Sequence, residues 1–173
     1  MKDDILCGSA CVKFILDYYG ITKIELQRNM FWTAELALAL KKAGLCIEVR
    51  CFNSKLYDDY IQNKKYDFDG FKYLNKMGKE KIPLIVKKFD CSQIEEEISK
   101  NDFVILCVES KIFNLDASMS GGHFIMLNWI DNKIKVINPV KNGFETLYLD
   151  SDFLVKCSEN FGSWRILIKR SKL

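Results

Sequence analysis

The last third of the chain carries the pattern that most restricts its fold, because short apolar runs alternate with turn residues there. The runs at 123–127 and 133–137 are separated by Asp131-Asn132, and the run at 144–149 follows a turn at 141–143. Asp-Asn and Asn-Gly between alternating apolar segments are typical of β-hairpins. These residues predict an antiparallel strand meander.

The first third of the chain has helical periodicity instead. Apolar residues recur there on one helical face, in Cys7, Ala10, Cys11, Phe14, Ile15 and Tyr18. Gly20 ends this predicted helix, and a second helix is predicted from a Thr33 N-cap to Gly44. Further elements are expected as strands at 46–52, 103–108 and 164–169, helices capped by Ser92 and Ser151, and irregular short helices within 53–82.

The order of these elements predicts the fold class. Helices come first and antiparallel strands last, which is typical of an α+β protein. We therefore expect N-terminal helices packed on a C-terminal antiparallel sheet. A single domain over residues 1–173 is expected, because no linker, repeat or low-complexity tract divides the chain.

Composition argues against several classes of protein. Of 173 residues, 49% are hydrophobic and 28% are charged, and acids and bases are mixed along the chain to give a net charge of +3. No block of like charge therefore predicts a nucleic-acid or membrane partner. No apolar stretch reaches the roughly 20 residues that span a bilayer. The N-terminus does not read as a signal peptide, so we expect a cytoplasmic protein.

The seven cysteines are odd in number, form no Cys-x-x-Cys pair and share the chain with a single histidine. This pattern argues against a disulfide scaffold and against a zinc site, and no cofactor is expected. Four of them lie in apolar segments and are predicted to be buried hydrophobes: Cys46, Cys51, Cys107 and Cys157.

Cys7 stands where the first predicted helix begins. A helix N-terminus and a nearby imidazole both lower the pKa of a thiol, so Cys7 can become a thiolate nucleophile near neutral pH. The amide of Cys7 can point at a developing oxyanion, and Gly8 leaves room for an acyl group to approach the backbone. The alternative is that Cys7 only begins the buried face of the helix.

His123 follows Gly121-Gly122 at a predicted loop-to-strand junction. A hairpin that turns at 131–132 returns Asn138 to the side of His123. Cysteine, histidine and a side-chain amide are the nucleophile, base and orienting residue of papain-like enzymes. The alternatives are a structural histidine and a turn asparagine before Pro139. The polar end of the preceding loop is predicted to line a substrate channel with Asp116, Ser118, Ser120, Gly121 and Gly122.

Two segments also carry a family resemblance. One is Cys7-Gly-Ser-Ala-Cys11 with a helix that ends in Tyr-Tyr-Gly20, and the other is Gly122-His123-Phe leading to Asn138-Pro. Together they resemble the papain-like cysteine peptidases that remove double-glycine leader peptides from bacteriocin precursors. The resemblance implies a papain-like fold with Cys7 as the nucleophile. It does not extend over 53–100, where the chain is longer than the family.

Two positions depart from the family pattern. Asn138 stands where the family usually has aspartate, and an amide oxygen can also accept the imidazole N–H. Met1 stands in place of a glutamine that donates to the oxyanion, and losing one such donor costs about 100- to 1000-fold in rate. A thioester is attacked more easily than an amide, so the second departure favours an activated acyl donor.

These observations lead to three functional hypotheses. The first is an acyl or peptidyl transferase in natural-product biosynthesis, in which Cys7 takes an acyl group from a carrier-protein thioester and a small amine resolves it into an amide. This activity resembles that of protease homologues recruited into natural-product assembly, such as closthioamide-type polythioamide biosynthesis. The second is a stand-alone peptidase that cuts precursor peptides after Gly-Gly. The third is an inactive peptide-docking module. The presence of both Cys7 and His123 argues against this hypothesis, because a docking module needs neither.

Overall fold

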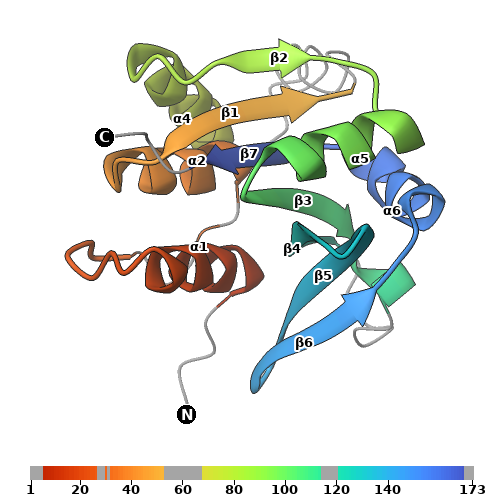
Figure 1. The fold of residues 1–173 in the computed structure, drawn as a ribbon. Helices are drawn as coiled ribbons and strands as arrows, with labels where there is room; N and C mark the ends of the chain where they lie inside the picture. Colours follow the sequence, from red (N-terminus) through yellow and green to blue (C-terminus); the bar gives the residue numbers. More distant parts are fainter. Residues whose placement is uncertain (1–5, 27–29, 31, 53–67, 114–120, 170–173) are drawn as a thin grey trace.

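The computed structural model describes residues 6–26, 30, 32–52, 68–113 and 121–169. Its centre is a seven-stranded mixed sheet in the order β2-β1-β7-β3-β4-β5-β6 (Figure 1). The strands are β1 (Cys46–Cys51), β2 (Leu84–Val86), β3 (Phe103–Glu109), β4 (Gly122–Ile130), β5 (Lys133–Val140), β6 (Gly143–Tyr148) and β7 (Arg165–Lys169). Strands β1 and β2 pair in parallel, and all other neighbours pair antiparallel.

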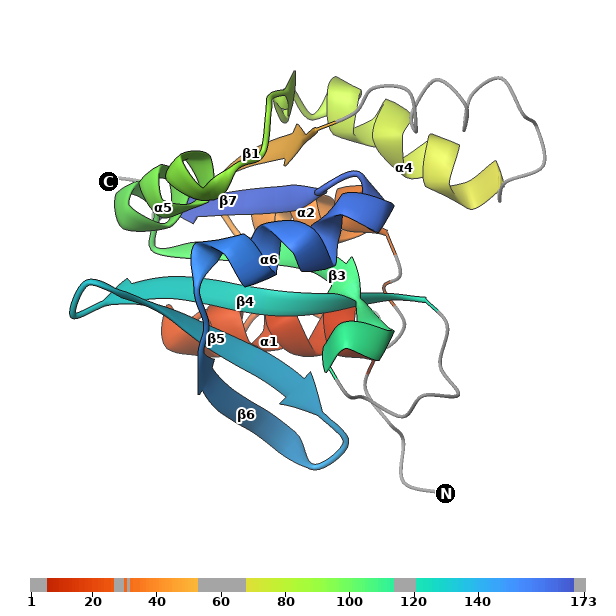
Figure 2. The same ribbon diagram turned by 90° about the vertical axis from the view of Figure 1, so that its right-hand side faces the viewer.

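Helices cover both faces of the sheet. They are α1 (Cys7–Tyr18), α2 (Thr33–Lys42), α4 (Phe68–Lys79), α5 (Cys91–Lys100) and α6 (Ser151–Ser158), with short 3-10 helices η1 (Ser110–Phe113) and η2 (Glu159–Phe161). Helices α1 and α2 pack on one face, whereas α5 and α6 pack on the other (Figures 1 and 2). The helix α4 packs against α2.

The core is divided by the sheet into two apolar clusters. Successive side chains of a strand point to opposite faces. In β4, Phe124 and Met126 accordingly belong to the cluster beneath α1 and α2, whereas Ile125 and Leu127 belong to the cluster beneath α5 and α6. Strand β3 contributes to both clusters in the same alternating way. Both faces are buried, which explains why 103–108 is continuously apolar.

The predicted α+β class is confirmed, but the arrangement of its parts differs from the prediction. The sheet is mixed rather than antiparallel, because β2 runs parallel to β1. It is not confined to the C-terminal half, since β1 and β2 form one of its ends. Strand β2 was not predicted: it is three residues long and follows Pro83 among lysines, so it has too little pattern to be read.

The predicted turn agrees with the structure, whereas the predicted helix N-caps do not. The hairpin at Asp131-Asn132 is confirmed, with φ values of 50° and 58° that suit a two-residue turn between twisted strands. The predicted caps are wrong by one position or more. Helix α5 is capped by Asp90, whose carboxylate accepts the Gln93 N–H, rather than by Ser92. Helix α6 is capped by Asp150 rather than Ser151, and α2 begins at Thr33 without a side-chain cap.

All seven cysteines are free thiols. Cys51, Cys107 and Cys157 are buried, as predicted, but Cys46 is exposed at the start of β1, so its assignment to the core is wrong. Within the described ranges, no helix combines the length and the apolar character needed to cross a bilayer.

Candidate active site

The site begins with a split between β4 and β5. Their pairing runs from Ile130↔Lys133 to Met126↔Ile137 and then stops, although β5 continues to pair with β6 as far as Val140↔Gly143. The next pair of the same type would place Phe124 opposite Pro139, where each residue normally donates one N–H to the other. Proline has no N–H to donate, so the ladder cannot continue in its usual form.

Helix α1 takes the place of the missing strand contact. Phe124 has its carbonyl oxygen 3.5 Å from Cys11 Sγ, which donates to it. The N–H of Phe124 points at the thiol of Cys7, where it favours the thiolate. The two polar groups that would have paired with β5 therefore face the first and second turns of α1.

Cys7 is the first residue of α1 and is half-buried. Burial raises the pKa of its thiol above the ordinary 9.0, and this effect outweighs the opposing hydrogen bonds from the amides of Phe124, Gly8 and Cys7 itself. The expectation of a thiolate near neutral pH is therefore wrong for the chain without substrate. Burial destabilises the thiolate more than the hydrogen bonds from the three amides stabilise it.

His123 and Asn138 are brought together as the hairpin predicts. His123 Nε2 lies 2.7 Å from Asn138 Oδ1, across the split between β4 and β5. Asn138 is fully buried and His123 is 8% exposed, so water barely competes for this hydrogen bond. Burial lowers the pKa of the imidazole below 6.5, although the bond to Asn138 opposes this shift. The imidazole is therefore neutral at pH 7.

The hydrogen bonds of Asn138 define its orientation. Its Nδ2 lies 3.4 Å from Glu145 Oε2 and donates to it. Its Oδ1, which can only accept, therefore faces the histidine, and His123 Nε2 must carry the proton of that hydrogen bond. The lone pair of the imidazole is then on Nδ1.

Cys7 and His123 reach the split from different sides. The thiol packs with the cluster beneath α1, whereas strand alternation places His123 on the face of Ile125 and Leu127. Among the described residues, no hydrogen bond joins the Cys7 thiol to the His123 imidazole, and the closest link is the backbone of Phe124. Catalytic hydrogen bonds are often long in the absence of substrate and tighten in the complex.

Two glycines have packing roles that the sequence did not predict. A Cβ at Gly8 would lie 2.5 Å from the carbonyl oxygen of Met30, so the missing side chain lets the Met30 backbone approach α1. A Cβ at Gly122 would lie 3.0 Å from Cys107 Sγ and 3.2 Å from the ring of Phe161. Both glycines permit close packing inside the protein.

The predicted substrate channel is described only in part. Asp116, Ser118 and Ser120 lie outside the described residues. Gly121 is exposed. Its carbonyl oxygen accepts two hydrogen bonds from Ser110, one from the backbone N–H at 3.1 Å and one from the side-chain hydroxyl at 2.9 Å. These two bonds join η1 to the residue before β4 and so fix the approach to His123.

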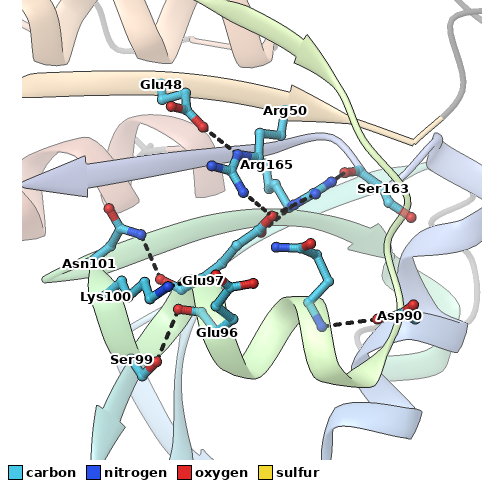
Figure 3. A network of polar contacts seen from close by, with 11 residues as sticks. Glu48, Arg50, Asp90, Glu96, Glu97, Ser99, Lys100, Asn101, Ser163 and Arg165 are labelled. Carbon is cyan, nitrogen blue, oxygen red and sulfur yellow. Dashed lines mark hydrogen bonds and ion pairs between the residues drawn. The ribbon is translucent and has the colours of Figure 1, made fainter.

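A separate pocket of about 230 Å³ lies between α5 and the strands β1 and β7. It contains none of the three predicted catalytic residues. Its floor is a network in which Glu97 binds Arg165 at 2.5 and 2.8 Å and Arg50 at 2.7 Å (Figure 3). Arg50 also pairs with Glu48, and the Arg165 guanidinium lies 4.4 Å from the centre of the Phe89 ring. These charges satisfy one another, which favours a structural role.

Sequence reasoning missed two members of the site, Glu145 and the backbone of Phe124. Both could be found by counting residues from the turns. A two-residue turn that joins Val140 to Gly143 sets Asn138 opposite Glu145, which is the observed register. Counting back from the turn at 131–132 sets Phe124 opposite Pro139, and proline signals the interrupted ladder.

No family model, curated protein or solved structure matches this chain.

Proposed function

We propose that the protein is a papain-like acyl or peptidyl transferase of the cytoplasm that forms an amide bond through a thioester on Cys7. One observation carries the proposal. The first residue of α1 is a cysteine beside the backbone of Phe124, and the preceding residue of β4 is a neutral histidine that binds a buried amide. These contacts support the proposal, because a papain-like site needs a nucleophile, a base and an orienting residue near one another, although Cys7 and His123 lie on different sides of β4.

The acylation step moves one proton and one acyl group. Cys7 Sγ attacks the carbonyl carbon of a carrier-protein thioester, and the thiol proton passes to His123 Nδ1, directly or through one water. The carbon–sulfur bond to the carrier then breaks, and the departing carrier thiolate takes the proton from the imidazole. The products are the free carrier thiol and an acyl group bound to Cys7.

The second step repeats this chemistry with an amine. A small amine attacks the Cys7 thioester, gives a proton to His123 Nδ1 and forms the amide bond. Cys7 leaves as thiolate and regains its proton from the imidazole. The thiol and the imidazole are both neutral at rest, so neither carries a buried charge before substrate binds, and the amine attacks as its neutral form.

The first turn of α1 can stabilise the oxyanion of both steps. Among the described residues, the first bond of this helix runs from the Ala10 N–H to the Leu6 carbonyl oxygen, so the amides of Cys7 and Gly8 have no helical partner there. These amides point at the Cys7 thiol, and amides at a helix start favour negative charge. Met1 stands where the resembling family has an oxyanion-binding glutamine, so the backbone amides would be the main oxyanion donors. Weaker oxyanion stabilisation favours a thioester as the acyl donor, because a peptide bond is less reactive.

Intact-mass spectrometry tests the proposal. The protein is incubated with an acyl thioester on a carrier protein and, in parallel, with a peptide that contains Gly-Gly. We expect an acyl adduct from the thioester that maps to Cys7, is absent in Cys7→Ala and persists in Cys46→Ala, the matched change at an exposed thiol. Added amine should convert the adduct to amide in preference to free acid.

The same samples distinguish the alternatives. Cleavage of the Gly-Gly peptide at a rate comparable to thioester consumption would favour the leader peptidase, which the sequence resemblance supports. Free acid as the dominant product at every amine concentration would favour hydrolysis over transfer. No adduct with either substrate would leave the docking module as the better hypothesis.

A further inference from the structure

The buried amide of Asn138 has two neighbours that determine which way it points. On one side is His123 Nε2 at 2.7 Å, and on the other is Glu145 Oε2 at 3.4 Å. An imidazole nitrogen can either donate or accept, so His123 alone does not define the orientation of the amide. A carboxylate only accepts, so Glu145 does define it.

We propose that Glu145 is a positioning residue of the site: its carboxylate holds Asn138 with Oδ1 toward His123 and thereby keeps the imidazole in the Nε2–H tautomer, with the Nδ1 lone pair ready to take the Cys7 proton. This inference rests on the proposed function, because the tautomer matters only if His123 is the base. The chain of effects runs from Glu145 on β6 through Asn138 on β5 to His123 on β4.

The same contact explains why an asparagine stands at position 138. An aspartate there would still accept the His123 N–H, but it would place a second carboxylate within 3.4 Å of Glu145 Oε2. Like charges at that separation repel, and although the exposed Glu145 is partly screened by water, a carboxylate at the fully buried position 138 is not. Asparagine is the residue that accepts from histidine and donates to Glu145.

The chain has one histidine, so the nitrogen spectrum of the imidazole reports on this site alone. We expect the resting protein, labelled with ¹⁵N, to show one protonated nitrogen, Nε2, and one bare nitrogen, Nδ1. In Glu145→Gln the amide of the new side chain can donate as well as accept, so both tautomers should be populated. A spectrum with Nδ1–H in the unaltered protein, or tautomer populations that Glu145→Gln leaves unchanged, would overturn the proposal.

Kinetics supply the second readout. Glu145→Gln should lower kcat about tenfold with KM nearly unchanged, by analogy with hydrogen-bond partners of metal-binding histidines, whose loss costs roughly 10- to 100-fold. Asn138→Asp alone should lose more, and adding Glu145→Gln to it should restore activity, because the glutamine can donate to the new carboxylate. A double variant no better than Asn138→Asp alone would contradict the coupling. Glu80→Gln, which changes the same charge at an exposed helix end, is the matched control.

These outcomes separate the positioning role from the proposed reaction. If no substrate acylates Cys7 but Glu145→Gln still changes the tautomer, the proposed function fails and the link through Asn138 stands. If Cys7 is acylated and neither the tautomer nor kcat responds to Glu145→Gln, the positioning role fails and the proposed function stands.

Discussion

At the scale of single residues, burial favours the uncharged form of both the proton donor, Cys7, and the proton acceptor, His123, of the proposed proton transfer. It raises the pKa of the Cys7 thiol above 9.0 and lowers the pKa of the His123 imidazole below 6.5. The resting pair is therefore thiol and imidazole rather than thiolate and imidazolium. In such a site the nucleophile is made during the attack, which limits side reactions of the free thiol.

This neutral pair predicts the pH dependence of activity. If His123 is the base, its protonation should remove the proposed activity, and because the imidazole pKa is lowered, the acidic limb of kcat/KM should lie below pH 6.5. Ionisation of Cys7 removes the proton that His123 must relay, and because the thiol pKa is raised, the alkaline limb should lie above pH 9.0. Iodoacetamide labelling of Cys7, followed by peptide mapping, should still accelerate above pH 9.0. A labelling rate that is already constant at neutral pH would indicate a preformed thiolate.

A second prediction at this scale concerns the glycines of the helices. Gly8→Ala should destabilise the protein by about 1–3 kcal/mol, because its Cβ would collide with the Met30 carbonyl oxygen. Gly78→Ala is the matched control in α4, since nothing lies within 4 Å of its Cβ. Alanine is the better helix former, so this change should stabilise by about 0.5–1 kcal/mol. Urea unfolding measures both, and equal effects of the two changes would refute the packing role of Gly8.

At the scale of elements, one buried carboxylate joins α5 to two strands of the sheet. Glu97 is 2% exposed and binds Arg165 of β7, which is fully buried, and Arg50 of β1 (Figure 3). The fork of Arg165 meets the two carboxylate oxygens in parallel bonds, the geometry in which arginine binds carboxylates best. This network fixes the position of α5 over β1 and β7.

Removing this carboxylate should therefore be costly. Glu97→Ala leaves the Arg165 guanidinium buried without its partner, and breaking a buried pair in this way destabilises a protein by about 3–5 kcal/mol. The control is Glu96→Ala on the same helix, whose pair with Lys100 is exposed and should contribute less than about 1 kcal/mol. Similar losses of unfolding free energy in the two variants would show that the buried network is not a main support of α5.

The elements differ, for physical reasons, in how far their positions can be predicted from the sequence. The neighbourhood of His123 and Asn138 could be predicted, because a two-residue turn determines register along a hairpin. The surroundings of Cys7 could not, since they include the Phe124 backbone, more than 100 residues away along the chain. The pairing of Glu97 with Arg165 was equally inaccessible, because each is one of many charged residues. Helix caps were misplaced where Asp and Ser compete for the same amides.

At the scale of the whole molecule, buried thiols predict how stability depends on pH. Burial raises the pKa of Cys7, Cys11 and Cys51, and that of Cys107 to about 12. Each of these thiols keeps its proton in the folded chain at pH values where the unfolded chain has lost it. The free energy of unfolding should therefore fall as the pH rises above 9.0, with a slope of up to about 1.4 kcal/mol per pH unit for each thiol.

Urea unfolding under reducing conditions, at several pH values on either side of 9.0, measures this slope. Cys107→Ala should make the slope shallower, whereas Cys46→Ala, at an exposed thiol, should leave it unchanged. Stability that rises with pH in this range, or a slope that Cys107→Ala does not alter, would contradict the assignment to buried thiols.

The position of β7 affects the order in which the molecule can be assembled. Among the described strands β7 comes last in the sequence, yet it lies between β1 and β3, where it joins the part of the sheet next to α2 to the hairpins that carry His123 and Asn138. A chain still on the ribosome that ends before Arg165 has two partial sheets with no strand between them. Contacts so distant in sequence also form slowly. The nascent chain can therefore pack α1 against β4 and β5 before β7 emerges, whereas β1 and β2 join the hairpins only when Arg165–Lys169 is available to pair with both β1 and β3.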